Sequence, residues 1–344
     1  MQKISLGKRV LRNKAFPLLV ILIAMAIITM IFSSGVLNGK GFSSLFVAGF
    51  MASGNLLNVF YSLVIQCIIL CGLAVILMGG SIDLSVSGQA ALGSMVFALI
   101  CSLTNMPWGF ALLISLVLGA CFGLINTFLV NVLRFPAFIA TIGMASIYTG
   151  ICNVLTQGNI VQIGRPGVVA ITQARLFGNR LPVTFLISIA LIIIYQLMLS
   201  RTRFGRSVFM AGGNAQAARL SGLNPNRIRL ILFINNGVLA TFGGIIYSAQ
   251  IKQAGPSNLV AMAPDMRVIA AAVLGGVSFM GGTGNLGGPL VALLLINVFN
   301  NMLTVLKAPT YWTIFAQGFL LVVALIIDFV REERRRLALL TGAK

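Results

Sequence analysis

Long apolar runs separated by short polar segments dominate the pattern of the chain. A membrane-spanning helix needs about 20 mostly apolar residues, because each residue adds about 1.5 Å toward a hydrocarbon core of about 30 Å. By this criterion the sequence predicts ten spanning helices. They are expected at Ala15–Leu37, Leu57–Met78, Gly88–Leu103, Trp108–Val130, Pro136–Leu155, Pro182–Ser200, Ile228–Gln250, Val268–Met280, Leu286–Leu306 and Tyr311–Phe329.

Two of these predicted spans, the third and the eighth, are short and rich in glycine. For the glycine-rich segments 79–88 and 275–288, a spanning path and a re-entrant path therefore both stay open. The composition agrees with the pattern, since 58% of the 344 residues are hydrophobic and 8% are charged. A soluble chain would carry about a quarter charged residues. We expect an all-α integral membrane protein with one transmembrane domain over residues 1–344, not a soluble enzyme.

The charged residues predict an orientation. The chain has 24 lysine and arginine residues against 5 acidic ones, and most of the basic residues lie in the tail 1–14, at Arg134, in the loop of about 201–227 and in the tail 330–344. Cytoplasmic segments of membrane proteins carry this excess. We therefore expect both termini in the cytoplasm and the loop of about 156–181 outside. The basic residues lie between apolar runs, so they do not indicate a nucleic-acid partner.

The sequence contains no motif by which the chain could bind ATP, and few residues that could couple transport to an ion or a proton. It contains no histidine, and its 5 cysteines all lie in apolar runs, so no metal site is predicted. A proton relay built from so few acidic residues has little support. No glycine-lysine pair completes a phosphate-binding P-loop. Gly282–Gly287 has the spacing G-x-G-x-x-G, but no strand precedes it, and close helix packing explains the glycines better.

The polar loop 201–227 contains a predicted short helix. Asn214 is a favourable N-cap, the stretch Ala215–Leu220 consists of good helix formers, and Gly222 is suited to the left-handed position after a helix. A short helix with small residues can enter a groove of another protein. The alternative from this pattern alone is an ordinary cytoplasmic loop with one helical turn.

The loop 202–223 resembles the coupling loop of importer permeases of the ATP-binding-cassette class, in the ribose, xylose and galactose branch. Gln216, Ala217 and Ala218, followed by Gly222, are similar to that class's motif E-A-A-x-x-x-G, with glutamine in place of glutamate. Three further stretches resemble signatures of the same branch, in the same order. They are Gly79–Gly88 (GGSIDLSVSG), Pro136–Gly143 (PAFIATIG) and Ile269–Ser278 (IAAAVLGGVS) with the glycines that follow it.

This resemblance implies a permease subunit that translocates a monosaccharide across the bacterial inner membrane, as a multi-pass protein. Its partners would be an ATPase subunit, a periplasmic or lipoprotein solute-binding protein, and a second copy or a related permease. ATP would be bound by the ATPase subunit, so no cofactor is expected in this chain. The resemblance assigns the coupling loop to Gly205, Gly212, Gly213, Asn214, Ala217, Ala218 and Gly222. Ribose, xylose, galactose and the furanosyl signalling molecule of the branch all stay open as substrates.

Polar residues inside apolar runs mark either contacts between helices or a solute pathway. Such polar residues include Gln66, Asn126, Asn153, Asn235 and Asn236. The candidates for a pathway or a structural role are Asp83, Ser85, Thr141, Gly275 and Gly276 in the signature stretches, and Asn235 and Asn236 in the predicted span Ile228–Gln250. Asp83 is a lone carboxylate in a break rich in glycine and serine. A structural role at a helix N-terminus is favoured for it over a direct role in the pathway. The alternative to the importer is a stand-alone secondary transporter or facilitator of a small polar solute, and a membrane scaffold is a third possibility.

Overall fold

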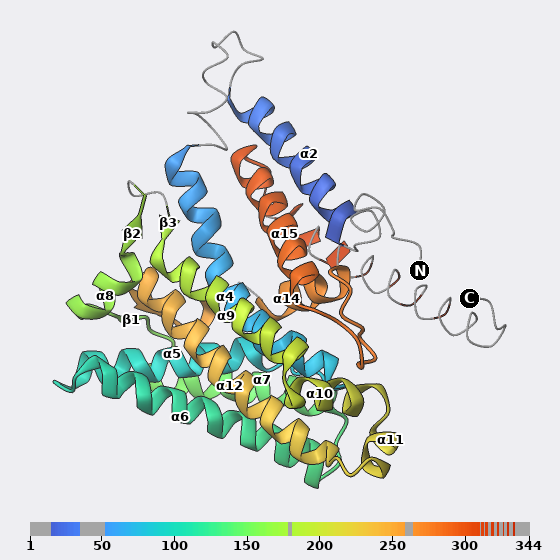
Figure 1. Ribbon diagram of the computed structural model, residues 1–344. Coiled ribbons are helices and arrows are strands. Elements are labelled where there is room, and N and C mark those ends of the chain that lie inside the picture. The colour runs from blue at the N-terminus through green and yellow to red at the C-terminus, as the bar shows by residue number, and fades with distance from the viewer. Residues whose placement is uncertain are drawn as a thin grey trace.

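The computed structural model describes residues 15–34, 52–177, 181–258 and 264–309, with single positions between 311 and 333. Seven described helices have the length and apolar composition to cross a membrane. They are α4 (Ser53–Met78), α5 (Val86–Leu103), α6 (Trp108–Thr127, continued by the π-helix η3, Phe128–Val132), α7 (Ala137–Thr156), α9 (Val183–Arg201), α12 (Pro225–Gln250) and α15 (Gly287–Val305). An apolar helix of 20 residues, α2 (Ala15–Ser34), packs along α15 (Figure 1).

Helices α9 and α12 separate two groups of small elements. The 19 residues of α9 extend about 28 Å and the 26 residues of α12 about 39 Å. At one end lie α8 (Pro166–Gln173) and two antiparallel pairs of strands, β1 (Val161–Gln162) with β4 (Gln253–Ala254), and β2 (Arg175–Leu176) with β3 (Leu181–Pro182). At the other end lie α10 (Arg203–Gly213) and α11 (Ala215–Leu220) (Figure 1). The segments predicted to lie on opposite sides of the membrane are therefore at opposite ends of the bundle.

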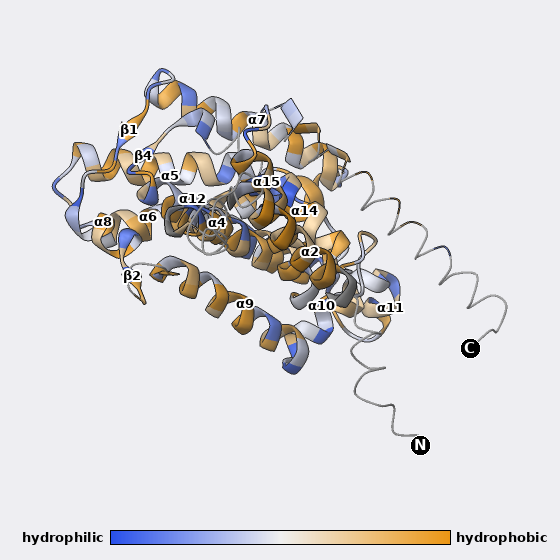
Figure 2. Ribbon diagram, turned by 90° about the horizontal axis from the view of Figure 1, so that it is seen from above, coloured by the Kyte–Doolittle hydropathy of each residue, from blue (hydrophilic) through white to orange (hydrophobic). Residues whose placement is uncertain are grey.

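The centre of the bundle is formed by α4 and α12. Nearly all side chains of α4 from Leu63 to Met78 are buried, and α12 packs against α4, α5 and α6. The colouring of Figure 2 shows hydrophobic residues along α2, α4, α9 and α15, and more hydrophilic ones on α11. Many outer side chains of α6, α7 and α9 are apolar and exposed, as expected for helices that face lipid.

Glycines bring α6 and α12 into backbone contact. A Cβ atom at Gly123 would lie 2.3 Å from the carbonyl oxygen of Phe233, and one at Gly237 would lie 2.1 Å from that of Gly119. Small residues four positions apart allow such close crossings in membranes. The glycine pair of α6 therefore packs within this bundle.

The predicted span Val268–Met280 is not a continuous helix in the structure. The helix α14 (Pro264–Leu274) has 11 residues and extends about 16 Å, roughly half of a hydrocarbon core. It ends where Gly275 lies against Gly288 and Pro289, and Gly276 adopts a left-handed φ of 95°, which a helix cannot continue through. The predicted span at Tyr311–Phe329 falls largely outside the described residues. The other predicted helices are present, with ends shifted by a few residues.

A short non-helical segment separates α4 from α5. Helix α4 ends at Met78, and residues 81–85 are non-helical before α5 begins at Val86. Asp83, Leu84 and Ser85 in this break are buried. Irregular backbone between membrane helices is tolerated where it is buried in protein, and this segment is buried from Asp83 to Ser85.

Candidate functional site

The first candidate site is the coupling element, which we define as α10, α11 and Gly222. Its helix α11 has the predicted bounds, and the Asn214 side chain caps it by accepting hydrogen bonds from the backbone N–H groups of Gln216 (3.0 Å) and Ala217 (2.9 Å). Gly222 follows with a left-handed φ of 80°. Helix α10 begins where the Thr202 hydroxyl accepts a hydrogen bond from the Gly205 N–H at 3.0 Å. These local signals set where both helices begin and where α11 ends.

A close backbone contact, which we call the glycine junction, ties the coupling element to the bundle. It consists of Met78, Gly80, Gly212 and Gly282. The Gly282 N–H donates a hydrogen bond of 2.8 Å to the Met78 carbonyl oxygen. A Cβ atom at Gly212 would lie 2.0 Å from the same oxygen, and one at Gly80 would lie 3.1 Å from the Gly212 Cα. The junction therefore joins three of the four stretches that carried the family resemblance.

The exposed face of α11 differs from the expected one. Ala218, expected within the surface that meets a partner, is only 1% exposed and packs inward against this chain. Ala217 is exposed, as expected, and Leu220 is 89% exposed. The reason is geometric, because the α10–α11 corner turns one side of this short helix toward the bundle. The burial of Ala218 corrects its expected place on the surface, and Leu220 was missed although a leucine in a polar loop is a signal for it.

The second candidate site is a buried polar cluster around Asp83, whose side chain is fully buried. Its Oδ1 accepts hydrogen bonds from the Ser85 N–H (2.9 Å) and hydroxyl (2.5 Å). Its Oδ2 accepts from the amide of Asn236 (2.9 Å) and from that of Gln89 (3.2 Å). The amide of Asn126 approaches both oxygens at 3.4 Å and donates to the Ser85 hydroxyl at 2.8 Å.

The cluster joins helices α5, α6 and α12 to the break before α5. Asp83 lies just before the start of α5, as expected, but its main contacts are with side chains from three helices. The Gln89 and Asn236 amide oxygens have no hydrogen-bond partner among the described residues. Both amides can therefore rotate to present an oxygen instead of an N–H group. Gln89 was not among the expected residues, and Asn126 was considered only as one of the polar residues in the apolar runs, since nothing local in the sequence shows that either residue meets Asp83.

The remaining expected residues lie at helix contacts. The Thr141 hydroxyl on α7 accepts a hydrogen bond of 3.0 Å from the Leu84 N–H, so α7 supports the same break. Asn235 is apart from the cluster and accepts a hydrogen bond from the Tyr195 hydroxyl on α9. A Cβ at Gly275 would lie 2.1 Å from the nitrogen of Pro289, and Gly276 is next to it. The structure brings together Asp83, Ser85, Thr141 and Asn236, and it keeps the coupling element at the adjacent glycine junction.

A cavity of about 550 Å³ lies between α5, α7 and α14. Its polar lining consists of Ser87, Ser146, Thr149, Asn153 and Asp265. Ser146, Thr149 and Asn153 share one face of α7, at helical spacing. Hydroxyl and amide groups of this kind can exchange hydrogen bonds with a polyhydroxylated solute. Sequence reasoning included Asn153 among the polar residues of the apolar runs, but it missed the hydroxyls, because serine and threonine are common inside membrane helices.

The bundle of apolar helices and its buried polar break are features expected of a multi-pass membrane permease. Comparison with known proteins agrees. The model of the family described as "Branched-chain amino acid transport system / permease component" matches residues 55–325. The chain belongs to this family of permeases.

Individual relatives are similar along most of their length. The autoinducer 2 import system permease protein LsrC of Photorhabdus laumondii is 35% identical over 274 residues, which cover 78% of this chain and 80% of the relative. LsrC of Yersinia enterocolitica is 32% identical over 272 residues, or 78% of this chain and 74% of the relative. The L-arabinose transport system permease protein AraH of Escherichia coli K12 is 29% identical over 293 residues, or 85% and 88%. No solved structure matches the chain.

These relatives confirm the resemblance to permeases of ATP-binding-cassette importers. The chain is therefore the permease component of such an importer, and ATP hydrolysis belongs to a separate subunit. The reading as a stand-alone transporter is not favoured.

Proposed function

We propose that this chain translocates a monosaccharide or a related furanosyl compound across the bacterial inner membrane. ATP is bound by a partner ATPase that docks on the coupling element, and a solute-binding protein delivers the solute at the opposite end, near α8 and β1–β4. The chain itself needs no cofactor. The substrate class rests on the relatives named for L-arabinose and autoinducer 2 transport, and on the neutral polar groups of the cavity beside α7.

One observation carries the mechanism. The coupling element meets the bundle at the glycine junction, where backbone touches backbone with no side chain between them. A rigid contact of this kind passes a displacement of α11 directly to the end of α4 and to the glycine-rich turn after α14. The end of α4 leads into the buried break around Asp83, and the glycine-rich turn after α14 begins at Gly275 and Gly276. Closure of the ATPase would therefore move the irregular segments of the bundle first.

The same geometry supports a pairing with a second permease. Ser146 and Asn153 of α7 are exposed, and Thr149 is half-buried between them. Their donors bond largely to carbonyl oxygens of α7 itself, with Thr149 to Ala145 at 2.8 Å and Asn153 to Thr149 at 2.9 Å. The side-chain oxygens of these three residues can still accept hydrogen bonds, and exposing them to lipid without a donor would be unfavourable. A second copy or a related permease would cover this face and leave the solute pathway between the two.

The docking proposal is tested by Leu220→Glu. Leu220 is the most exposed large apolar side chain of α11, so it is suited to a groove on the ATPase. Placing a carboxylate there would bury an unpaired charge and cost several kcal/mol, enough to dissociate a moderate interface. We expect normal membrane levels, loss of the co-purifying ATPase and loss of solute uptake.

Gln216→Glu is the matched control. It makes the same change of charge on an exposed residue of the same helix, at the position where the family motif itself carries glutamate. We expect this variant to keep both ATPase association and uptake. Docking on α11 would be refuted if Leu220→Glu retained the ATPase, or if both variants lost it equally.

A further inference from the structure

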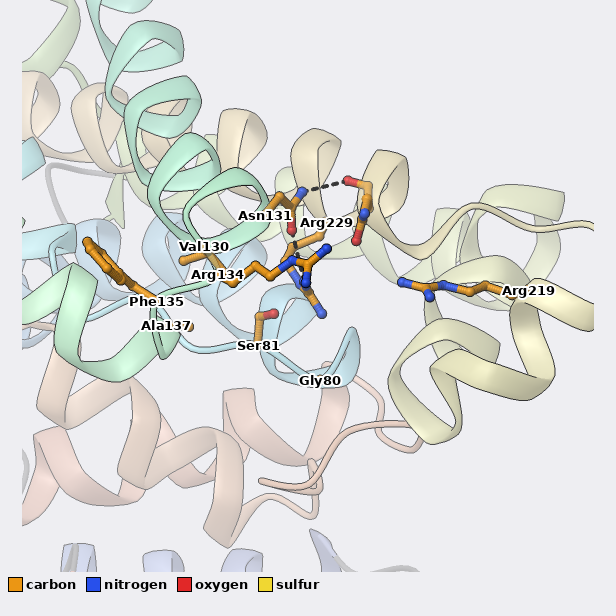
Figure 3. A pocket seen from close by; sticks show the side chains of 10 residues that line it. Gly80, Ser81, Val130, Asn131, Arg134, Phe135, Ala137, Arg219 and Arg229 are labelled. Carbon is orange, nitrogen blue, oxygen red and sulfur yellow. Dashed lines mark hydrogen bonds between the residues drawn. The ribbon is translucent and has the colours of Figure 1, made fainter.

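A second cavity, of about 600 Å³, lies at the end of the bundle that carries α11. Three of its lining side chains are arginines, contributed by the segment after η3 (Arg134), by α11 (Arg219) and by α12 (Arg229). Figure 3 shows Arg219 directed toward Arg134 and Arg229 from the opposite wall. The lining residues all belong to the described part of the chain, and none of them is acidic. Three like charges thus face one cavity without a counter-charge from its walls.

The hydrogen bonds of Arg229, which lines the cavity, are only partly satisfied within the chain. One terminal nitrogen, Nη1, donates to the Asn131 side-chain oxygen at 2.9 Å, and the Asn131 amide in turn donates to the backbone oxygen of Asn226 at 2.9 Å. The Nε of Arg229 is buried and has no hydrogen-bond partner among the described residues. Buried donors of charged groups are nearly always paired, so Arg229 carries a positive charge beside the cavity that its contacts within the chain only partly satisfy.

Arg134 is held in the cavity wall by an unusual backbone. It has a left-handed φ of 57°, and the Phe135 N–H after it closes the end of η3 by donating to the Leu129 carbonyl oxygen at 3.1 Å. Glycine is the usual residue at this position of a helix end. An arginine in its place fixes a positive charge at the mouth of the cavity.

We propose that this cavity binds a phosphate group, carried either by the headgroup of an anionic phospholipid or by a free phosphate in the cytoplasm. A phosphate offers several acceptor oxygens and close to two negative charges, and arginine forks match its geometry. A single carboxylate would leave more of the three positive charges unbalanced. Both candidate ligands, the lipid headgroup and the free phosphate, presuppose that α11 faces the cytoplasm, so this proposal rests on the orientation in the proposed function.

The surface beside the cavity is suited to a lipid. Phe135, which lines the cavity, is 51% exposed, and Phe138 and Ile139 at the start of α7 are 54% and 65% exposed. Acyl chains can lie against these side chains while the headgroup enters the cavity. Basic pockets between membrane helices on the cytoplasmic side bind phospholipid headgroups in this way. A phosphate held there would also join α11 to α12, and so would stabilise the coupling element against the bundle.

The test uses the full chain in neutral detergent, stripped of phospholipid and free of phosphate. Inorganic phosphate is titrated in one arm, and phosphatidylglycerol or phosphatidylcholine in mixed micelles in two others. Melting temperature and retained lipid, by native mass spectrometry, are measured in each. We expect binding of phosphatidylglycerol, of phosphate, or of both, and little binding of phosphatidylcholine. Binding of phosphatidylglycerol alone identifies a lipid site, and binding of inorganic phosphate a site open to free phosphate.

Arg219→Gln is the main variant, because this exposed residue can be changed with little risk to folding. It should weaken binding roughly tenfold or more, the usual loss for one charge-assisted contact. Arg227→Gln is the control, since Arg227 is an exposed arginine of α12 outside the cavity, and it should leave binding unchanged. The proposal is wrong if neither probe binds or if both variants lose binding equally. It is also wrong if Arg219→Gln abolishes ATPase association with anion binding intact, which would assign the cavity to an acidic side chain of the ATPase.

Discussion

The glycine junction gives the sharpest prediction, because two adjacent glycines of α10 differ in what surrounds them. A Cβ at Gly212 would lie 2.0 Å from the Met78 carbonyl oxygen and 2.9 Å from the Gly282 nitrogen. A Cβ at Gly213 would lie 3.6 Å from the Gly282 Cα, an ordinary contact. Both glycines lie in α10, Gly213 as its last residue, so Gly→Ala gains at most about 0.5–1 kcal/mol of helix propensity at either site. The pair of variants therefore isolates the effect of the close contact.

In Gly212→Ala the new methyl group must displace backbone, since no flexible side chain can move aside. Overpacking of this kind costs about 1–3 kcal/mol. Separating Gly212 from Met78 would also weaken the hydrogen bond between Gly282 and Met78, which is worth about 0.5–1.5 kcal/mol. Together these effects destabilise the junction by about 1.5–4.5 kcal/mol, before the small gain in helix propensity is subtracted. Gly213→Ala should be neutral or slightly stabilising.

The assay compares three quantities for the two variants: the melting temperature in detergent, ATPase association, and solute uptake. Gly212→Ala should melt several degrees lower and should lose uptake while still binding the ATPase, because α11 itself is unchanged. Equal uptake and equal melting temperatures for Gly212→Ala and Gly213→Ala would refute the role of the junction.

Further predictions concern the buried break and the orientation. Asp83→Asn should fold and transport, because the amides of Gln89 and Asn236, whose oxygens are unpaired, can rotate to accept its N–H group. Asp83→Leu should leave several buried donors unpaired, so we expect this variant protein not to accumulate in the membrane. Thermal unfolding and uptake of the two variants distinguish these outcomes, and failure of a well-folded Asp83→Asn would show that the charge itself is required. Thr141→Val keeps the shape but leaves the buried Leu84 N–H unpaired, and it should lower the free energy of unfolding by about 1–3 kcal/mol, as measured in denaturant. In a cysteine-free background, Ala217→Cys should react with an impermeant thiol reagent only from the cytoplasm and Ala170→Cys only from outside; labelling of both from one side would contradict the orientation.

Features set by neighbouring residues were predictable from the sequence. The bounds of α11 follow from Asn214, which caps it, and from Gly222, which ends it, and both signals act within the same short segment. The long apolar helices were predictable for a similar reason, since length and hydrophobicity alone decide whether a helix can span a bilayer.

Features set by distant residues were not predictable. Helix α14 ends at Leu274 because Gly275 meets the backbone of Gly288 and Pro289, a contact that no local pattern reveals. The partners of Asp83 include Asn126 and Asn236, from two other helices.

Several of the polar residues in the apolar runs serve contacts between helices. The side chains of Gln66 and Asn297 exchange hydrogen bonds of 2.6 and 3.3 Å between α4 and α15, and those of Asn55 and Asn301 exchange bonds of 2.8 and 2.9 Å. Satisfying amides in pairs is the favourable solution inside a membrane. An amide in an apolar run is thus weak evidence for a solute pathway until its neighbours are known.

The central claim is that a separate ATPase drives solute movement through this chain by way of α11. The most direct measurement is uptake of labelled L-arabinose, ribose, xylose, galactose and autoinducer 2 into proteoliposomes that contain the permease and its ATPase. ATP is trapped in the lumen and the solute-binding protein is added outside. We predict that uptake of at least one of these solutes requires lumenal ATP, the ATPase and the binding protein together, and that Leu220→Glu abolishes it. Equal uptake by the permease alone, without ATP, would contradict the account.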